Sequence, residues 1–156
     1  MPATKKRNKK YRPKPPGTQL LKTQLWKVKA VFDPLESIID QLERDGTIDC
    51  TPGGTAIFKD SGDGNWYESP IAIMGVVDAY QMHQERRGID LGMDPLRKLA
   101  KKLEYSMPIF EADTKACRES LARMKRETLT MTADYASELI RDFQIKEAFQ
   151  KAAVIT

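Results

Sequence analysis

The amino-acid sequence predicts a mainly α-helical protein, a compact bundle of four or five helices with one small β-hairpin and a disordered basic N-terminal arm. Three observations lead to this expectation. Apolar residues recur at helical spacing over most of the chain behind residue 32. One stretch instead places aromatic and β-branched runs around a Gly/Asp cluster, which is typical of a hairpin. The first 17 residues contain few apolar side chains.

Charge is distributed unevenly along the 156 residues, although the formal net charge is only +4. Residues 1–29 contain ten Lys and Arg side chains and no Asp or Glu, so this part carries +10. The remaining 127 residues hold the other 16 basic side chains and all 22 acidic ones, and they sum to −6. Such asymmetry indicates a basic tail that has an anionic partner.

The basic arm, residues 1–17, reads MPATKKRNKKYRPKPPG and carries seven positive charges. We expect it to be disordered in isolation, because so little apolar surface cannot offset the entropy of ordering. Lys and Arg side chains neutralise phosphates and release counterions, and an aromatic ring among them can stack on an exposed base. The predicted nucleic-acid-binding residues are Lys5, Lys6, Arg7, Lys9, Lys10, Tyr11, Arg12 and Lys14.

Two other interpretations of the arm stay open. It can be a solvated tail that serves solubility alone. Alternatively, Lys6-Arg7-Asn8-Lys9 fits a short nuclear-import address, a pattern that is common by chance.

Residues 18–32 have enough apolar content to dock on the domain, and their pattern fits either a helix or a strand. The helical domain is expected over residues 33–156. Its first helix is predicted to start at Asp33-Pro34, because Asp33 can cap the helix and Pro34 suits the first turn. Gly46 is expected to end this helix.

A β-hairpin is expected at about 55–68, and further helices are expected from Ser69-Pro70 to Gly88, from Asp94-Pro95, from Pro108 and over about 132–152. Apolar residues at helical spacing predict which side chains face the core. The expected inward side chains include Leu35, Ile38, Ile39, Leu42, Ile73, Val76, Val77, Tyr80, Leu96, Leu99, Leu103, Phe110, Cys117, Leu121, Met124, Ala136, Leu139, Ile140, Phe143 and Phe149.

The sequence offers little for catalysis, so we expect a non-enzymatic protein with no catalytic residue, no metal and no cofactor. His83 is the only histidine, and we expect it to be exposed on a helix. Neither a second His nor a Cys at ligand spacing accompanies it, and no G-x-S-x-G motif is present. Helix-surface carboxylates are expected to be solvated or paired along a helix, namely Glu111, Asp113, Glu119, Glu127, Asp134 and Glu138.

Three weaker motifs have structural explanations. Residues 96–113 fit a helix-turn-helix poorly, because Glu104 occupies the position that normally takes Gly and the second helix is acidic, so an αα-hairpin is preferred. The Asp/Gly cluster at residues 60–65 lacks EF-hand spacing and is expected to be a turn. Cys50 and Cys117 form no C-x-x-C motif, and we expect both to be reduced.

No stretch approaches the roughly 20 apolar residues that span a bilayer, so we expect no membrane partner.

The segment Lys5-Lys6-Arg7-Asn8-Lys9-Lys10-Tyr11-Arg12-Pro13-Lys14-Pro15 resembles the start of a set of small phage and prophage accessory proteins. Those proteins begin with a similar basic Y-R-P-K/R segment and continue as short helical domains, and most have no assigned activity. The resemblance implies a mobile-element origin and the cytoplasm of a bacterial host, and it disfavours the nuclear-import address. It carries over no functional residue.

Two functions are therefore expected. The leading hypothesis is a non-enzymatic phage or prophage accessory protein whose basic arm contacts nucleic acid or a nucleoprotein. The alternative is a protein–protein adaptor or inhibitor of a host nucleic-acid-handling defence complex, which would act through the acidic helical domain.

Overall fold

The computed structural model describes residues 18–155, and the side chains of residues 18–149. This part forms five α-helices and one two-stranded sheet, so the predicted fold class is confirmed for it. The expected disorder of the arm concerns residues 1–17, which lie outside the described residues. The helices are α1 (Leu25–Asp45), α2 (Ser69–Arg87), α3 (Asp94–Glu104), α4 (Glu111–Thr128) and α5 (Ala133–Ile155).

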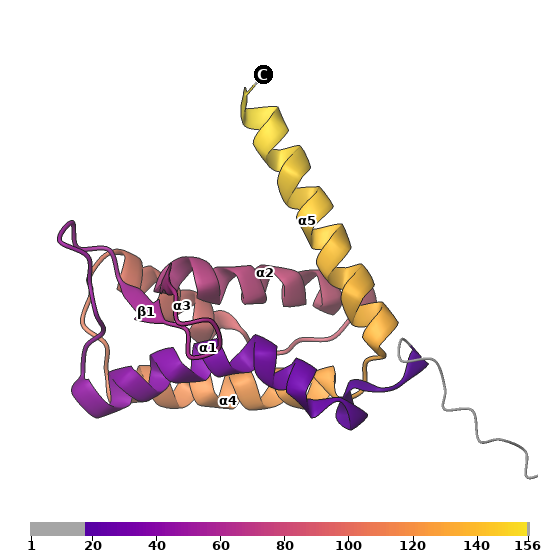
Figure 1. Ribbon diagram of the computed structural model, residues 1–156, viewed down its shortest axis with the longest axis horizontal. Helices are drawn as coiled ribbons and strands as arrows, with labels where there is room; N and C mark the ends of the chain where they lie inside the picture. Colours follow the sequence, from indigo (N-terminus) through magenta and orange to yellow (C-terminus); the bar gives the residue numbers. More distant parts are fainter. Residues whose placement is uncertain (1–17, 156) are drawn as a thin grey trace, which may run out of the picture.

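The first four helices pack into one bundle (Figure 1). In it, α1 lies along α4, α2 packs on α3, and α3 contacts α4. The first part of α5 packs on α2, and its C-terminal part then runs away from the bundle. Most of the apolar residues that the sequence places on inward faces meet in one core, and its largest fully buried side chains include Phe32, Leu35, Ile38, Ile39, Ile73, Val77, Met93, Leu96, Leu99, Leu121 and Met124.

Helix α1 begins at Leu25, so the predicted start at Asp33-Pro34 is wrong. A proline inside a helix removes a hydrogen bond and crowds the preceding turn. Tertiary packing offsets this cost here, because Val28 and Phe32 are buried before Pro34, and the Phe32 ring lies 5.9 Å from that of Tyr80 on α2. Residues 25–32 are therefore helical. The helix ends at Gly46, as predicted, with a left-handed φ of 72°.

The hairpin is confirmed as β1 (Ile57–Lys59) paired antiparallel with β2 (Trp66–Glu68). The predicted turn between the strands is confirmed as well. Asp60 accepts a hydrogen bond from the backbone N–H of Gly62, and Asp63 accepts one from that of Asn65. Both carboxylates therefore shape the turn, which is the common role of Asp in such positions.

Two predicted inward faces are partly wrong. Helix α4 starts at Glu111 rather than Pro108, and Phe110 at its N-cap is 62% exposed. The Asp113 carboxylate accepts a hydrogen bond from the backbone N–H of Phe110 and so fixes this start. On α5, Leu139 is buried as expected, but Ile140 is exposed and Phe149 is 72% exposed. The C-terminal part of α5, to which Phe149 belongs, runs away from the bundle.

Candidate functional site

The eight residues predicted to bind nucleic acid, Lys5 to Lys14, all lie outside the described residues, whereas the segment directly behind the arm is described. In that segment, the backbone N–H of Leu21 donates to the carbonyl of Met131 over 2.9 Å, and that of Ala133 donates to the carbonyl of Gln19 over 3.1 Å. Leu21 is buried. The chain is therefore fixed at the junction between α4 and α5. We call residues 19–21 the anchor.

A basic surface with an exposed aromatic ring lies next to the anchor, at the start of α1. Trp26 is 69% exposed, and the Nζ atom of Lys27 lies 5.4 Å from the centroid of its ring. Lys22 and Lys29 are exposed on either side of Trp26 in the sequence. We call Lys22, Trp26, Lys27 and Lys29 the N-terminal basic surface. In the sequence, Trp26 is only one of the apolar residues of the segment 18–32 that is expected to dock on the domain.

The spacing of apolar residues along α1 contains a pattern that predicts the exposure of Trp26. Val28, Phe32 and Leu35 recur at helical spacing and are buried on one face. Trp26 lies half a turn out of phase with that face, so a helix through residues 25–35 exposes it. The sequence alone does not predict this exposure, because the pattern of residues 18–32 fits a strand as well as a helix.

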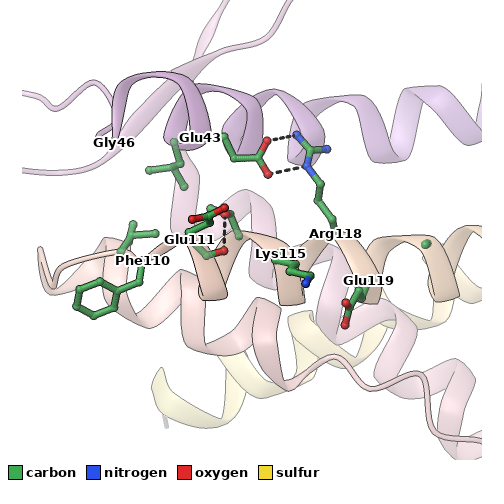
Figure 2. Close-up of a pocket in the computed structure, with 11 residues that line it drawn as sticks. Glu43, Gly46, Phe110, Glu111, Lys115, Arg118 and Glu119 are labelled. Atoms are coloured by element: carbon green, nitrogen blue, oxygen red, sulfur yellow. Dashed lines mark hydrogen bonds and ion pairs between the residues drawn. The ribbon is translucent and has the colours of Figure 1, made fainter.

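A groove of about 850 Å³ lies between the C-terminal part of α1 and the first turns of α4 (Figure 2). Figure 2 shows Arg118 of α4 reaching Glu43 of α1, with Nε 2.7 Å from Oε1 and Nη2 2.9 Å from Oε2. Arg118 also pairs with Asp40. These hydrogen bonds raise the pKa of Arg118 and lower the pKa of Glu43. The pairs therefore join α1 to α4 as fixed charges.

Charged side chains and one aromatic ring line this groove. The side chains of Glu111, Lys115 and Glu119 stand along α4, and the Phe110 ring lies at one end. No His, Cys or Ser is among the residues that line it. An exposed ring beside opposite charges suits a peptide of mixed charge.

The structure places His83 differently from the prediction. Its side chain is only 1% exposed, so the expected surface position is wrong. Nε2 lies 2.9 Å from Oε1 of Glu127 on α4, and Nδ1 lies 2.6 Å from the hydroxyl oxygen of Tyr135 on α5. Both ring nitrogens are therefore satisfied, which is what burial of an imidazole requires. The three side chains join α2, α4 and α5.

A histidine between a carboxylate and a phenol also occurs in catalytic sites, but burial decides against that role here. A substrate has to reach the ring, and 1% exposure leaves no surface for it. Tyr80, whose ring centroid lies 6.5 Å from that of His83, is also buried, which raises the pKa of its phenol to about 12, whereas the Glu127 side chain is 28% exposed. The cluster therefore has a structural role in this conformation.

Asp113 and Glu127 depart from the expected solvated carboxylates. Glu127 is a partner of His83, and Asp113 lies 2.6 Å from Nζ of Lys102, with both of those side chains 9% exposed. Burial by itself raises the pKa of Asp113. The hydrogen bonds from Lys102 and from the backbone N–H of Phe110 outweigh it, so the net shift is downward. The pair fixes α3 to the first turn of α4.

Another cavity, of about 540 Å³, lies between α1, α2 and the first half of α5. Its lining is mainly apolar and includes Val31, Val76 and Phe143. Ile140 belongs to the same lining, so its exposed surface faces this groove. None of the lining side chains indicates the chemistry of an occupant.

Neither a family model, nor a curated protein, nor a solved structure matches this chain. Among residues 18–149, no group of three or more His, Cys, Asp and Glu side chains is arranged to hold a metal ion. In the described part of the chain, no helix is both long enough and apolar enough to cross a membrane.

Proposed function

We propose that this chain is a non-enzymatic phage or prophage accessory protein, acting in the cytoplasm of a bacterial host, whose arm binds nucleic acid or a nucleoprotein. The observation that carries the proposal is the charge of the arm, +7 over 17 residues with no acidic side chain. Phosphate binding by such a segment needs no fixed geometry, because counterion release drives it. The resemblance of residues 5–15 supports the phage origin.

The anchor adds a physical reason for the arm to act together with the domain. The anchor, which follows the arm in the sequence and precedes the N-terminal basic surface, is fixed at the junction of α4 and α5. Along α1 the charge then changes sign, because the residues beyond Lys29 include five acidic side chains before Gly46. Nucleic acid is thus attracted to the start of α1 and repelled from its remainder. The acidic residues are Asp33, Glu36, Asp40, Glu43 and Asp45.

The test is the salt dependence of binding to a labelled oligonucleotide. If all seven arm charges contact phosphates, the slope of log affinity against log salt is about −5 for a single strand. A chain that begins at Thr18 should lose most of this slope and affinity. A matched control, Lys101→Gln with Lys115→Gln, removes exposed charge from the domain and should change neither. Unchanged binding after arm deletion would refute the proposal.

A second candidate function rests on the groove between α1 and α4. Its exposed Phe110 ring, beside Glu111 and Lys115, favours an adaptor or inhibitor that binds a protein of a host defence complex. The test is capture of partners from nuclease-treated bacterial lysate. Retention of one partner that is lost with Phe110→Ala, and kept after arm deletion, supports the adaptor. Loss of all partners after nuclease treatment favours nucleic acid.

A further inference from the structure

The exposed indole of Trp26 is the feature that the proposed function leaves unexplained. The same segment buries Leu21, Val28 and Phe32 in the core, although Leu25 is 55% exposed. Trp26 instead keeps 69% of its surface in solvent, on the face of α1 opposite to the core. Tryptophan is enriched at contact surfaces, because its ring offers a large, rigid contact area.

The surroundings of Trp26 indicate the charge of that molecule. Lys29 lies one helical turn later and Lys22 precedes the ring by four residues, and both are exposed. No acidic side chain occurs before Asp33. The arm, with seven further positive charges, ends directly before the anchor. An anion that also offers a flat π-surface matches this combination.

We propose that Trp26 stacks on an unpaired base of a single-stranded nucleic acid whose phosphates are bound by Lys22 and Lys29. This inference rests on the proposed function and makes its ligand class specific. Bases of a duplex are already stacked on one another, so their faces are not open to a ring on a helix surface. An unpaired base exposes its face and stacks on an aromatic ring without regard to sequence.

The protein contains an internal control for this site. Trp66 on β2 is the only other tryptophan, and it is 53% exposed. Residues 59–68 around it carry three acidic side chains and one lysine. Trp66 therefore matches Trp26 in exposure and has the opposite electrostatic surroundings. If exposure alone were sufficient for stacking, the two rings would respond alike.

The experiment uses the full chain in two single-tryptophan forms, Trp66→Phe, which reports on Trp26, and Trp26→Phe, which reports on Trp66. Fluorescence is measured during titration with single-stranded oligothymidylate, with an abasic oligonucleotide of equal length and with a blunt-ended duplex of two complementary strands. We expect oligothymidylate to quench Trp26 at saturation, and the abasic strand and the duplex to bind without comparable quenching. Trp66 should stay unquenched throughout.

Affinity gives a second readout that does not depend on fluorescence. Trp26→Ala should weaken binding of oligothymidylate by about 5-fold or more, and Trp66→Ala should leave it unchanged. Both positions are exposed, so circular dichroism should show the same helix content in both variants.

The possible failures are distinguishable. If the full chain binds with the expected salt slope but Trp26 is not quenched and Trp26→Ala binds normally, the stacking proposal is wrong and the arm proposal stands. Equal quenching by duplex and single strand also overturns it. If the full chain binds none of the three probes, both proposals fail.

Discussion

The side chains of His83 and Glu127 lie 44 residues apart in the sequence, and Nε2 of the imidazole is 2.9 Å from Oε1 of the carboxylate. This contact joins α2 to α4 inside the bundle. The other ring nitrogen bonds the hydroxyl group of Tyr135, which brings α5 to the same point. Three of the five helices in the described chain are thus held by one buried imidazole.

Replacement of His83 by Ala should lower the free energy of unfolding by about 3 kcal/mol, measured by urea denaturation. The change leaves a cavity, and it removes the hydrogen-bond partner of Glu127 and Tyr135. Glu85→Ala on the exposed face of the same helix is the control and should change the free energy by less than about 0.5 kcal/mol. Equal effects of the two substitutions would show that the cluster does not stabilise the bundle.

The lowered pKa of Asp113 predicts how the free energy of unfolding changes at acid pH. The folded pKa of this carboxyl lies below its ordinary value, so its contribution to stability is present in full above about pH 4. It is lost as the pH falls through the lowered folded pKa, because the unfolded chain then binds more protons. Urea denaturation between acid and neutral pH should therefore show a steeper loss for the wild type than for Asp113→Asn.

The same variant should cost about 3 kcal/mol near neutral pH, because Lys102 is left as a buried, partly unpaired cation. Lys98, whose Nζ lies 3.4 Å from Asp113, is exposed and compensates little. Glu119→Gln, on the exposed face of α4, serves as the matched control. A wild-type profile parallel to that of Asp113→Asn across acid pH would contradict the assignment.

Much of the fold could be predicted because its signals are local. Pro and Gly marked the ends of α2, and Asp94-Pro95 marked the start of α3. The hairpin could be predicted from its Asp/Gly turn. These residues act within a few positions of themselves, so a sequence pattern contains the information.

The remaining features depend on partners that are distant in the sequence. The sequence predicts that α1 begins at Asp33-Pro34. The helix begins eight residues earlier, at Leu25, because the packing of Phe32 on Tyr80 stabilises the turns before the proline. The burial of His83 depends on two residues that lie 44 and 52 positions away. The N-terminal basic surface was missed for the same reason. The exposure of Trp26 can be deduced only once α1 is known to begin at Leu25.

The two cysteines should differ in reactivity toward a thiol reagent such as Ellman's. Cys50 is exposed, while Cys117 is buried in the core and burial raises its pKa to about 12. The thiolate is the reactive species, so Cys117 is protected both by access and by protonation. One thiol should react rapidly in the folded protein and two in denaturant. The control Cys50→Ser should leave no rapid reaction, and rapid labelling of this variant would contradict the packing of α4.

The loop before α3 approaches the side chain of Arg123 closely at Gly92, and a substitution of this glycine tests the contact. The Arg123 guanidinium donates from Nε to the carbonyl of Leu91 over 2.8 Å and from Nη2 to that of Gly92 over 2.9 Å. A Cβ atom on Gly92 would lie 2.7 Å from Nη2, and the residue has a left-handed φ of 63°. Gly92→Ala should therefore combine backbone strain with displaced hydrogen bonds, at about 3 kcal/mol.

Gly88→Ala separates the two contributions, because Gly88 has a φ of 64° and nothing within 4 Å of an added Cβ. It should cost only the strain of the left-handed conformation, about 1 kcal/mol. In an Arg123→Ala background, the clash at Gly92 disappears, and Gly92→Ala should fall to the same value. Thermal or urea unfolding of the four variants forms a double-mutant cycle with one control. If Gly92→Ala costs as much without Arg123 as with it, the guanidinium does not hold this loop.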